Sequence, residues 1–141
     1  MNESLIRGSF KVVCPLLGIL SFIFLLRGHD LPGGGFIGGL LMSLALILHI
    51  IARSESRTKM WLNDNYSSIV AICILLLVLV FITPMFIGKS GLSAIWTKIP
   101  FPIAGKVSSV LLFDSIVFAI VSTSTTMAYV KFVDFSKRNK Q

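Results

Sequence analysis

The stretch that decides the fold runs from residue 67 to residue 88 and reads SSIVAICILLLVLVFITPMFIG. It contains no charged side chain and is rich in Ile, Leu and Val. A helix needs roughly 20 mostly apolar residues to cross the hydrocarbon of a bilayer. This segment meets that requirement, so it predicts a membrane-spanning helix.

Three further segments have the same character. Together with 67–88, the predicted spans cover approximately residues 10–26, 33–52 and 107–130. The charge-free run in the segment 10–26 covers only residues 12–26, which is short for a span, so we extend the segment to residue 10 and expect Lys11 to reach toward the membrane surface. No small-residue cleavage pattern follows it, which favours a retained helix over a signal peptide. The sequence therefore predicts an all-α membrane protein, a bundle of four transmembrane helices in one domain over residues 1–141.

The composition excludes several other classes of protein. Of the 141 residues, 55% are hydrophobic and 13% are charged, whereas a soluble domain carries about 25% charged residues. An ordinary cytosolic enzyme, a disordered chain and a nucleic-acid-binding domain are therefore excluded. Cys14 and Cys73 both lie within apolar runs, where cysteine behaves as a small buried hydrophobe. We find no metal-ligand cluster, cofactor motif or activated nucleophile, and we predict no enzymatic activity.

The basic residues predict how the chain is oriented. With four spans, both termini and the central loop lie on one side of the membrane, and nine of the 13 Lys and Arg residues fall on that side. Cytoplasmic loops carry the excess of positive charge in membrane proteins. Both termini are therefore predicted to be cytoplasmic in the cell (inner) membrane. The net charge of +7 is explained by residues that flank the spans.

The connection between the first two predicted spans is unusually rich in glycine. Residues 27–39 read RGHDLPGGGFIGG. Pro32 fixes one turn, and Gly33, Gly34 and Gly35 permit backbone conformations that other residues avoid, so the chain can re-enter the membrane tightly. The backbone here either packs against another helix or lines an ion or water path, and the residues alone leave both interpretations open.

Small residues continue from this turn along the second predicted span. Gly35, Gly39 and Ser43 are spaced four residues apart, and Gly38 belongs to a parallel row that starts at Gly34. On a membrane helix, such spacing forms a stripe that another helix can approach closely.

Three ionisable residues are candidates for an ion path. Asp114 lies seven residues into the fourth predicted span, about 10 Å below the outer boundary. An acid at that depth is costly unless it is neutral, paired or hydrated, so it indicates either an ion-path group or an interhelical hydrogen bond. His29 lies beside the glycine turn, where Asp30 caps a helix or pairs with a neighbour. His49, near the cytoplasmic end of the second span, is either an interhelical hydrogen-bonding residue or a proton relay.

The segment RGHDLPGGGFIGGL, residues 27–40, closely resembles the signature of the MnhB/MrpB family, one of the small membrane components of the multisubunit Mrp (Mnh) sodium/proton antiporters. Two further stretches are similar, TPMFIGK at residues 83–89 and LFD at residues 112–114. The likeness extends over nearly the whole chain. Relatives often have a glycine shortly after the acidic residue, whereas this chain has Ser115, Ile116 and Val117.

The resemblance implies a non-catalytic subunit of a hetero-oligomeric complex that exchanges sodium for protons. Its implied partners are the other antiporter subunits and the lipid bilayer, with sodium and protons as transported ions and no nucleic acid. The subunit is expected to contribute packing surface and part of the ion path, with Asp114 as the first candidate. One alternative is a structural or assembly protein without an ion-path role. Another is a small multidrug/proton exchanger, although the first span lacks the acidic residue that those transporters carry.

Overall fold

The computed structural model describes residues 3–28, 32–52, 57–86, 88, 90, 96–101 and 105–139. Four helices dominate the described chain, and each is long and apolar enough to cross a membrane. They are α1 (Glu3–Arg27), α2 (Gly35–Ala52), α3 (Arg57–Phe86) and α4 (Ser109–Arg138). The predicted membrane fold of four transmembrane helices is confirmed.

Three of the helices are longer than the predicted spans. α1 begins at Glu3, α3 begins at Arg57 and α4 continues to Arg138. A charge-free run measures only the part of a helix that lies in hydrocarbon, whereas a helix continues until its backbone is interrupted. No Pro or Gly lies between Arg57 and Ser67 or between Val130 and Arg138, so polar turns extend the helices beyond the apolar spans.

A short antiparallel hairpin precedes α4, and the sequence did not predict it. Strand β1 (Trp96–Phe101) pairs with strand β2 (Gly105–Ser108), with Phe101 opposite Gly105 and Pro100 opposite Lys106. Proline cannot donate to a strand ladder, but a two-stranded hairpin has free edges where that donor is not needed. Residues 96–101 and 105–108 of the connection between α3 and α4 therefore form a small ribbon.

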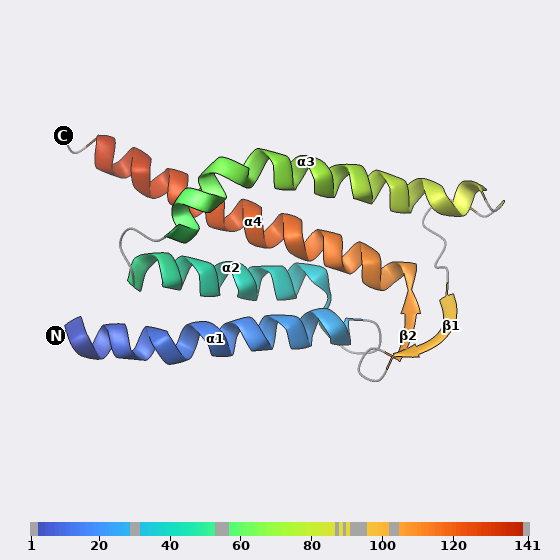
Figure 1. Ribbon diagram of the computed structural model, residues 1–141, viewed down its shortest axis with the longest axis horizontal. Helices are drawn as coiled ribbons and strands as arrows, with labels where there is room; N and C mark the ends of the chain where they lie inside the picture. Colours follow the sequence, from blue (N-terminus) through green and yellow to red (C-terminus); the bar gives the residue numbers. More distant parts are fainter. Residues whose placement is uncertain are drawn as a thin grey trace.

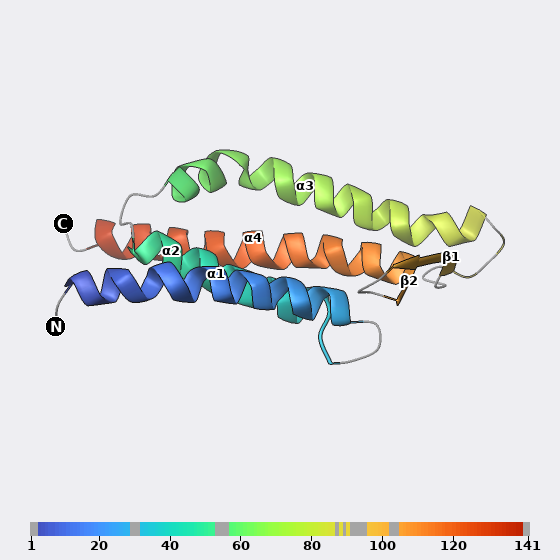
Figure 2. The same cartoon turned by 60° about the horizontal axis from the view of Figure 1, so that its bottom comes forward.

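The four helices form an open row in the order α1, α2, α4, α3 (Figure 1). α2 packs against α1 and α4, and α3 packs mainly against α4. The turned view shows that α3 lies apart from α1 (Figure 2). α2 and α4 run in the same direction, each starting at the end of the molecule that carries the hairpin. We call this the hairpin end, and the opposite end, which carries both chain termini, the terminal end.

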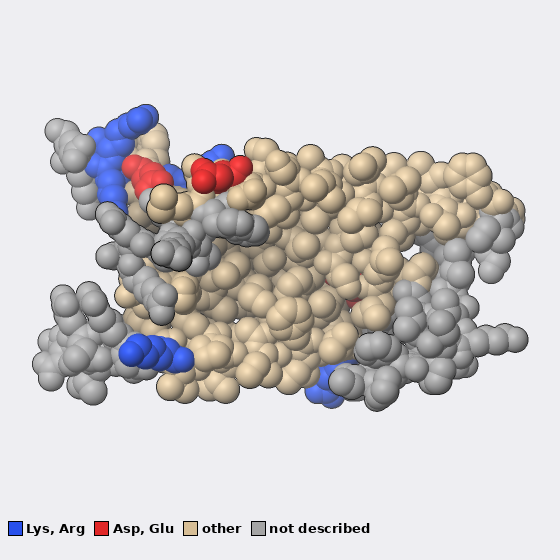
Figure 3. Space-filling view, viewed as in Figure 1, with Lys and Arg blue, Asp and Glu red and all other residues tan. Residues whose placement is uncertain are grey.

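The largest group of buried apolar side chains lies toward the terminal end. It consists of Ile50, Leu62, Met127 and Val130, with Tyr66 packed against it. The Lys131 ammonium lies 5.4 Å from the centre of the Tyr66 ring, so a cation–π contact joins α4 to α3 here. Most of the charged side chains visible in Figure 3 gather at this end. The middle of the visible face is almost entirely tan in Figure 3, with one small recessed red patch toward the hairpin end, as suits a membrane-embedded surface.

Candidate functional site

Asp114 lies close to the hairpin end of α4. It follows the first residue of the helix, Ser109, by five positions, which places it about 8 Å along the helix axis. Its side chain is partly buried. Within the part of the chain that the structure describes, no hydrogen bond or ion pair engages its carboxylate.

The Asp114 carboxylate lies against the glycine turn that joins α1 to α2. A Cβ built on Gly28 would lie 3.0 Å from Asp114 Oδ2. A Cβ on Gly34 would lie 3.4 Å from the same oxygen and 3.7 Å from Oδ1. Two features that the sequence flags separately, the acid and the glycine turn, therefore meet at one place.

Hydrogen bonds and close contacts to α1 hold the turn itself. The Gly34 N–H donates to the Phe24 carbonyl at 2.9 Å, and the Gly28 N–H donates to the Leu25 carbonyl at 3.4 Å. Gly34 has a φ of +102°, a left-handed conformation that favours glycine. A Cβ on Gly33 would lie 2.6 Å from the Phe24 carbonyl oxygen. Side chains at these positions would open the turn.

α2 then approaches α4 backbone to backbone. A Cβ on Gly35 would overlap the Asp114 carbonyl oxygen and would lie 2.9 Å from Asp114 Cα. One turn later, a Cβ on Gly39 would lie 2.9 Å from Val121 Cβ and 3.0 Å from the Phe118 carbonyl oxygen. These two glycines form the α2 side of a seam with α4, which also fixes the backbone of Asp114.

Gly38 lies on the neighbouring face of α2, toward α1. A Cβ there would lie 2.8 Å from the Ser21 carbonyl oxygen and 3.2 Å from a ring carbon of Phe118. Because Gly38 has no side chain, the Phe22 ring of α1 and the Phe118 ring of α4 meet across α2, with their centroids 5.5 Å apart. The small residues of α2 therefore serve two helix contacts.

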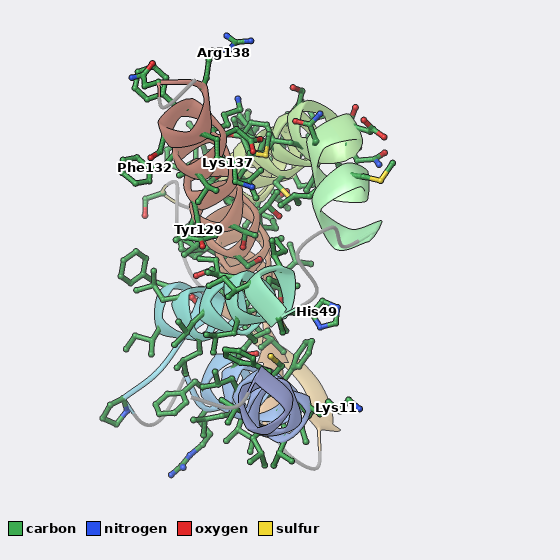
Figure 4. The ribbon with its side chains drawn as sticks, turned by 90° about the vertical axis from the view of Figure 1, so that its left-hand side faces the viewer. Lys11, His49, Tyr129, Phe132, Lys137 and Arg138 are labelled. Carbon is green, nitrogen blue, oxygen red and sulfur yellow. The ribbon has the colours of Figure 1, made fainter. Side chains whose placement is uncertain are left out.

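Other candidate residues lie away from Asp114 or outside the described chain. His29 is not among the described residues, and neither is Asp30. Pro32 and Phe36 are exposed at the turn and at the start of α2, the Phe36 side chain by 60%. His49 is 14 residues beyond Gly35, about 21 Å along α2. Figure 4 shows its ring projecting on the same side as Lys11 and away from Tyr129 and Phe132.

Three hydroxyl side chains of α4 bond to the backbone of their own helix, those of Ser115, Ser122 and Thr126. Thr126 is fully buried and its hydroxyl donates to the Ser122 carbonyl at 2.7 Å. The Ser122 hydroxyl donates to the Ala119 carbonyl at 3.2 Å. Ser115, beside the acid, is exposed and its hydroxyl donates to the Leu111 carbonyl at 2.8 Å. These hydroxyls satisfy the backbone of α4 and form no polar link from Asp114 toward His49.

Most of the chain matches one known family. Residues 5–127 match the family described as "Domain related to MnhB subunit of Na+/H+ antiporter". This chain belongs to the MnhB family. Its membership and its four apolar helices make it a multi-pass membrane protein.

Individual relatives agree with the assignment to the MnhB family. The chain is 35% identical over 129 residues to a Staphylococcus aureus (strain Newman) protein named "Putative antiporter subunit mnhB2", covering 89% of this chain and 92% of that protein. The protein of the same name from strain COL matches with the same identity and coverage. Among solved structures, "Structure of Mrp complex from Dietzia sp. DQ12-45-1b" has a similar fold, with a TM-score of 0.73 at 22% identity. That match covers 89% of this MnhB-family chain and 13% of the solved chain, which is much longer.

Gly28 is the residue of this site that sequence reasoning missed. The sequence pattern placed the turn at residues 32–35, with Gly28 only as part of a longer motif. A single glycine four residues before a proline carries little signal by itself. Its importance depends on the approach of α4, which comes from a segment 80 residues later in the chain.

Proposed function

We propose that this MnhB-family chain is a non-catalytic subunit of a hetero-oligomeric sodium/proton antiporter and that Asp114 is a proton-carrying group on its ion path. The observation that carries the proposal is the position of the carboxylate, partly buried near the hairpin end and pressed against the bare backbone of Gly28 and Gly34. An ionisable acid within a membrane helix is a functional candidate by default, because placing a charge in the bilayer is costly.

The orientation of the chain gives the path its direction. The excess of basic residues at the terminal end supports cytoplasmic termini in the cell membrane. The hairpin end then faces the outside of the cell. Asp114 lies about 8 Å along α4 from the external end of that helix, so it is close to the external solution. We infer that Asp114 receives protons from outside as sodium leaves the cell elsewhere in the complex.

A single chain does not complete such a path. His49 lies about 21 Å along α2 from Gly35, the residue that contacts the Asp114 backbone, and no other titratable side chain lies in that interval on α2. The Ser122 and Thr126 hydroxyls of α4 bond to their own helix. Partner subunits are therefore expected to supply the remaining groups, and the open row of helices leaves large apolar faces for them and for lipid.

The test is sodium/proton exchange in inverted vesicles that contain the full complex. Asp114→Asn is expected to lower exchange at least about tenfold, the range of single acid–base groups, while native gels show an intact complex. Asp134→Asn, an exposed acid at the other end of the same helix, is the matched control and should retain exchange. Unchanged exchange with Asp114→Asn would leave the chain as a structural subunit. Loss of the complex itself would make Asp114 an assembly contact.

A further inference from the structure

We propose that Gly28 and Gly34 are positioning residues that hold the Asp114 carboxylate at the start of α2, and that sodium/proton exchange by the complex depends on this placement. The functional part of this inference rests on the proposed role of Asp114. The positional part rests on the packing of the turn alone. The two parts can therefore fail separately.

The bare α-carbons of both glycines border the space that the carboxylate occupies. At Gly28 an added methyl group would lie 3.0 Å from Oδ2, which is closer than ordinary van der Waals contact, and would also overlap Gly34 Cα. At Gly34 the distance of 3.4 Å is tolerable, but the φ of +102° disfavours any side chain. Alanine at position 28 would therefore push the carboxylate and the turn apart.

The start of α2 makes this position electrostatically distinctive. The first N–H groups of a helix have no partner within it, and the positive end of the helix dipole lies there. Gly34 immediately precedes α2, so the carboxylate lies where a negative charge is favoured. The influence of the dipole fades within one helical turn. A small displacement of the carboxylate therefore changes its electrostatic surroundings.

Few charged groups on the described elements compete with this influence. α1 ends on Arg27, which is exposed and directly precedes Gly28. α2 carries no ionisable side chain before His49, and the charged residues of described α3 lie toward the terminal end. The side chains of His29, Asp30, Lys98 and Lys106 fall outside the described part of the chain.

The chain supplies controls that separate positioning from packing. A Cβ on Gly33 would disturb the same turn through the Phe24 carbonyl, and its nearest atoms belong to Phe24 and Gly28. A Cβ on Gly39 would crowd Val121 and Phe118 in the α2–α4 seam. A Cβ on Gly18 would meet nothing within 4 Å. Alanine at position 33 would therefore disturb the turn, alanine at position 39 would disturb the seam, and alanine at position 18 would disturb neither.

The experiment uses the full complex carrying Gly28→Ala, Gly33→Ala, Gly39→Ala or Gly18→Ala. The pH midpoint of exchange is measured per assembled complex in inverted vesicles. The infrared band of the Asp114 carboxyl group is identified by its absence in Asp114→Asn. Its intensity is then followed against pH in the purified complex, a measurement that does not depend on transport. Gly28→Ala is expected to shift both midpoints by at least about 0.5 pH unit, because the carboxylate is displaced from the start of α2. Gly33→Ala and Gly39→Ala, whose Cβ atoms do not meet the carboxylate, should shift the midpoints less than Gly28→Ala, and Gly18→Ala should change neither the midpoints nor the yield of complex.

Wild-type midpoints in assembled Gly28→Ala complex would overturn the inference. A shifted infrared midpoint together with unchanged exchange in Asp114→Asn would uphold the positional part and reject the proposed function. If Gly28→Ala does not assemble, Gly34→Ala is measured in its place, with the same expected shift. Failure of both to assemble while Gly39→Ala assembles would make the two glycines packing residues only, which also overturns the inference.

Discussion

At the hairpin end, α2 and α4 meet through glycine and backbone, whereas at the terminal end they meet through a cluster of large side chains. The first contact places Gly35 against the Asp114 backbone. The second packs Ile50 of α2 against Met127 and Val130 of α4. A backbone contact has no rotamers with which to adjust, while a side-chain cluster can repack. The polar group is therefore held at the rigid end of the seam.

Gly35→Ala tests the rigid end most severely. The new methyl group would overlap the Asp114 carbonyl oxygen, and overpacking against backbone costs about 3 kcal/mol, the upper part of the usual range. We expect less than about a tenth of the wild-type amount of assembled complex on native gels, since 1.4 kcal/mol corresponds to a factor of ten. Near-normal assembly would show that α2 can move away from α4, and the contrast between the two ends would not hold.

Met127→Ala tests the side-chain cluster at the terminal end. Met127 is 3% exposed, and truncation of a buried Met to Ala costs about 2 kcal/mol where the surroundings partly collapse, the lower end of the known range. We expect a lower thermal midpoint of the purified complex with the pH midpoint of exchange unchanged. Met127→Leu, which keeps the volume, is the control and should restore the thermal midpoint. A shifted pH midpoint would show that the two ends are coupled.

Tyr66→Leu tests the link between α3 and α4. Loss of the ring removes the cation–π contact with Lys131, worth about 0.5–1 kcal/mol at a partly exposed site. The expected result is a small fall in the thermal midpoint that Tyr66→Phe does not produce, because Phe keeps the ring face. Equal effects of Leu and Phe would assign the contribution to the hydroxyl instead.

Gly18→Ala should have the smallest effect of the series. A Cβ there meets nothing within 4 Å, and a substitution away from packed features changes stability by about 0.5 kcal/mol or less. Thermal midpoint and exchange should both match the wild-type complex. Reduced assembly would instead reveal that another subunit packs against this position on α1.

The sequence predicted the four membrane helices because charge-free length depends on residues that are adjacent in the chain. It located the glycine turn and Asp114 for the same reason, since each is a local departure from the apolar pattern. It did not predict that the turn and Asp114 meet. That contact exists because α4, and not α3, packs beside α2. It also missed the hairpin, because Pro100 and Pro102 interrupt the strand pattern. The extended ends of α1, α3 and α4 were missed because polarity was used to mark where the helices end.

The order of helices in the row also constrains how the protein is made. α1 and α2 are neighbours along the chain and in space, so they can associate as soon as both have entered the membrane. α3 follows next during synthesis but makes few contacts with α2. Until α4 arrives and inserts between them, a nascent chain holds one helical hairpin and one nearly unattached helix. Biogenesis of this fold is complete only with its last helix, which is also the helix that carries Asp114.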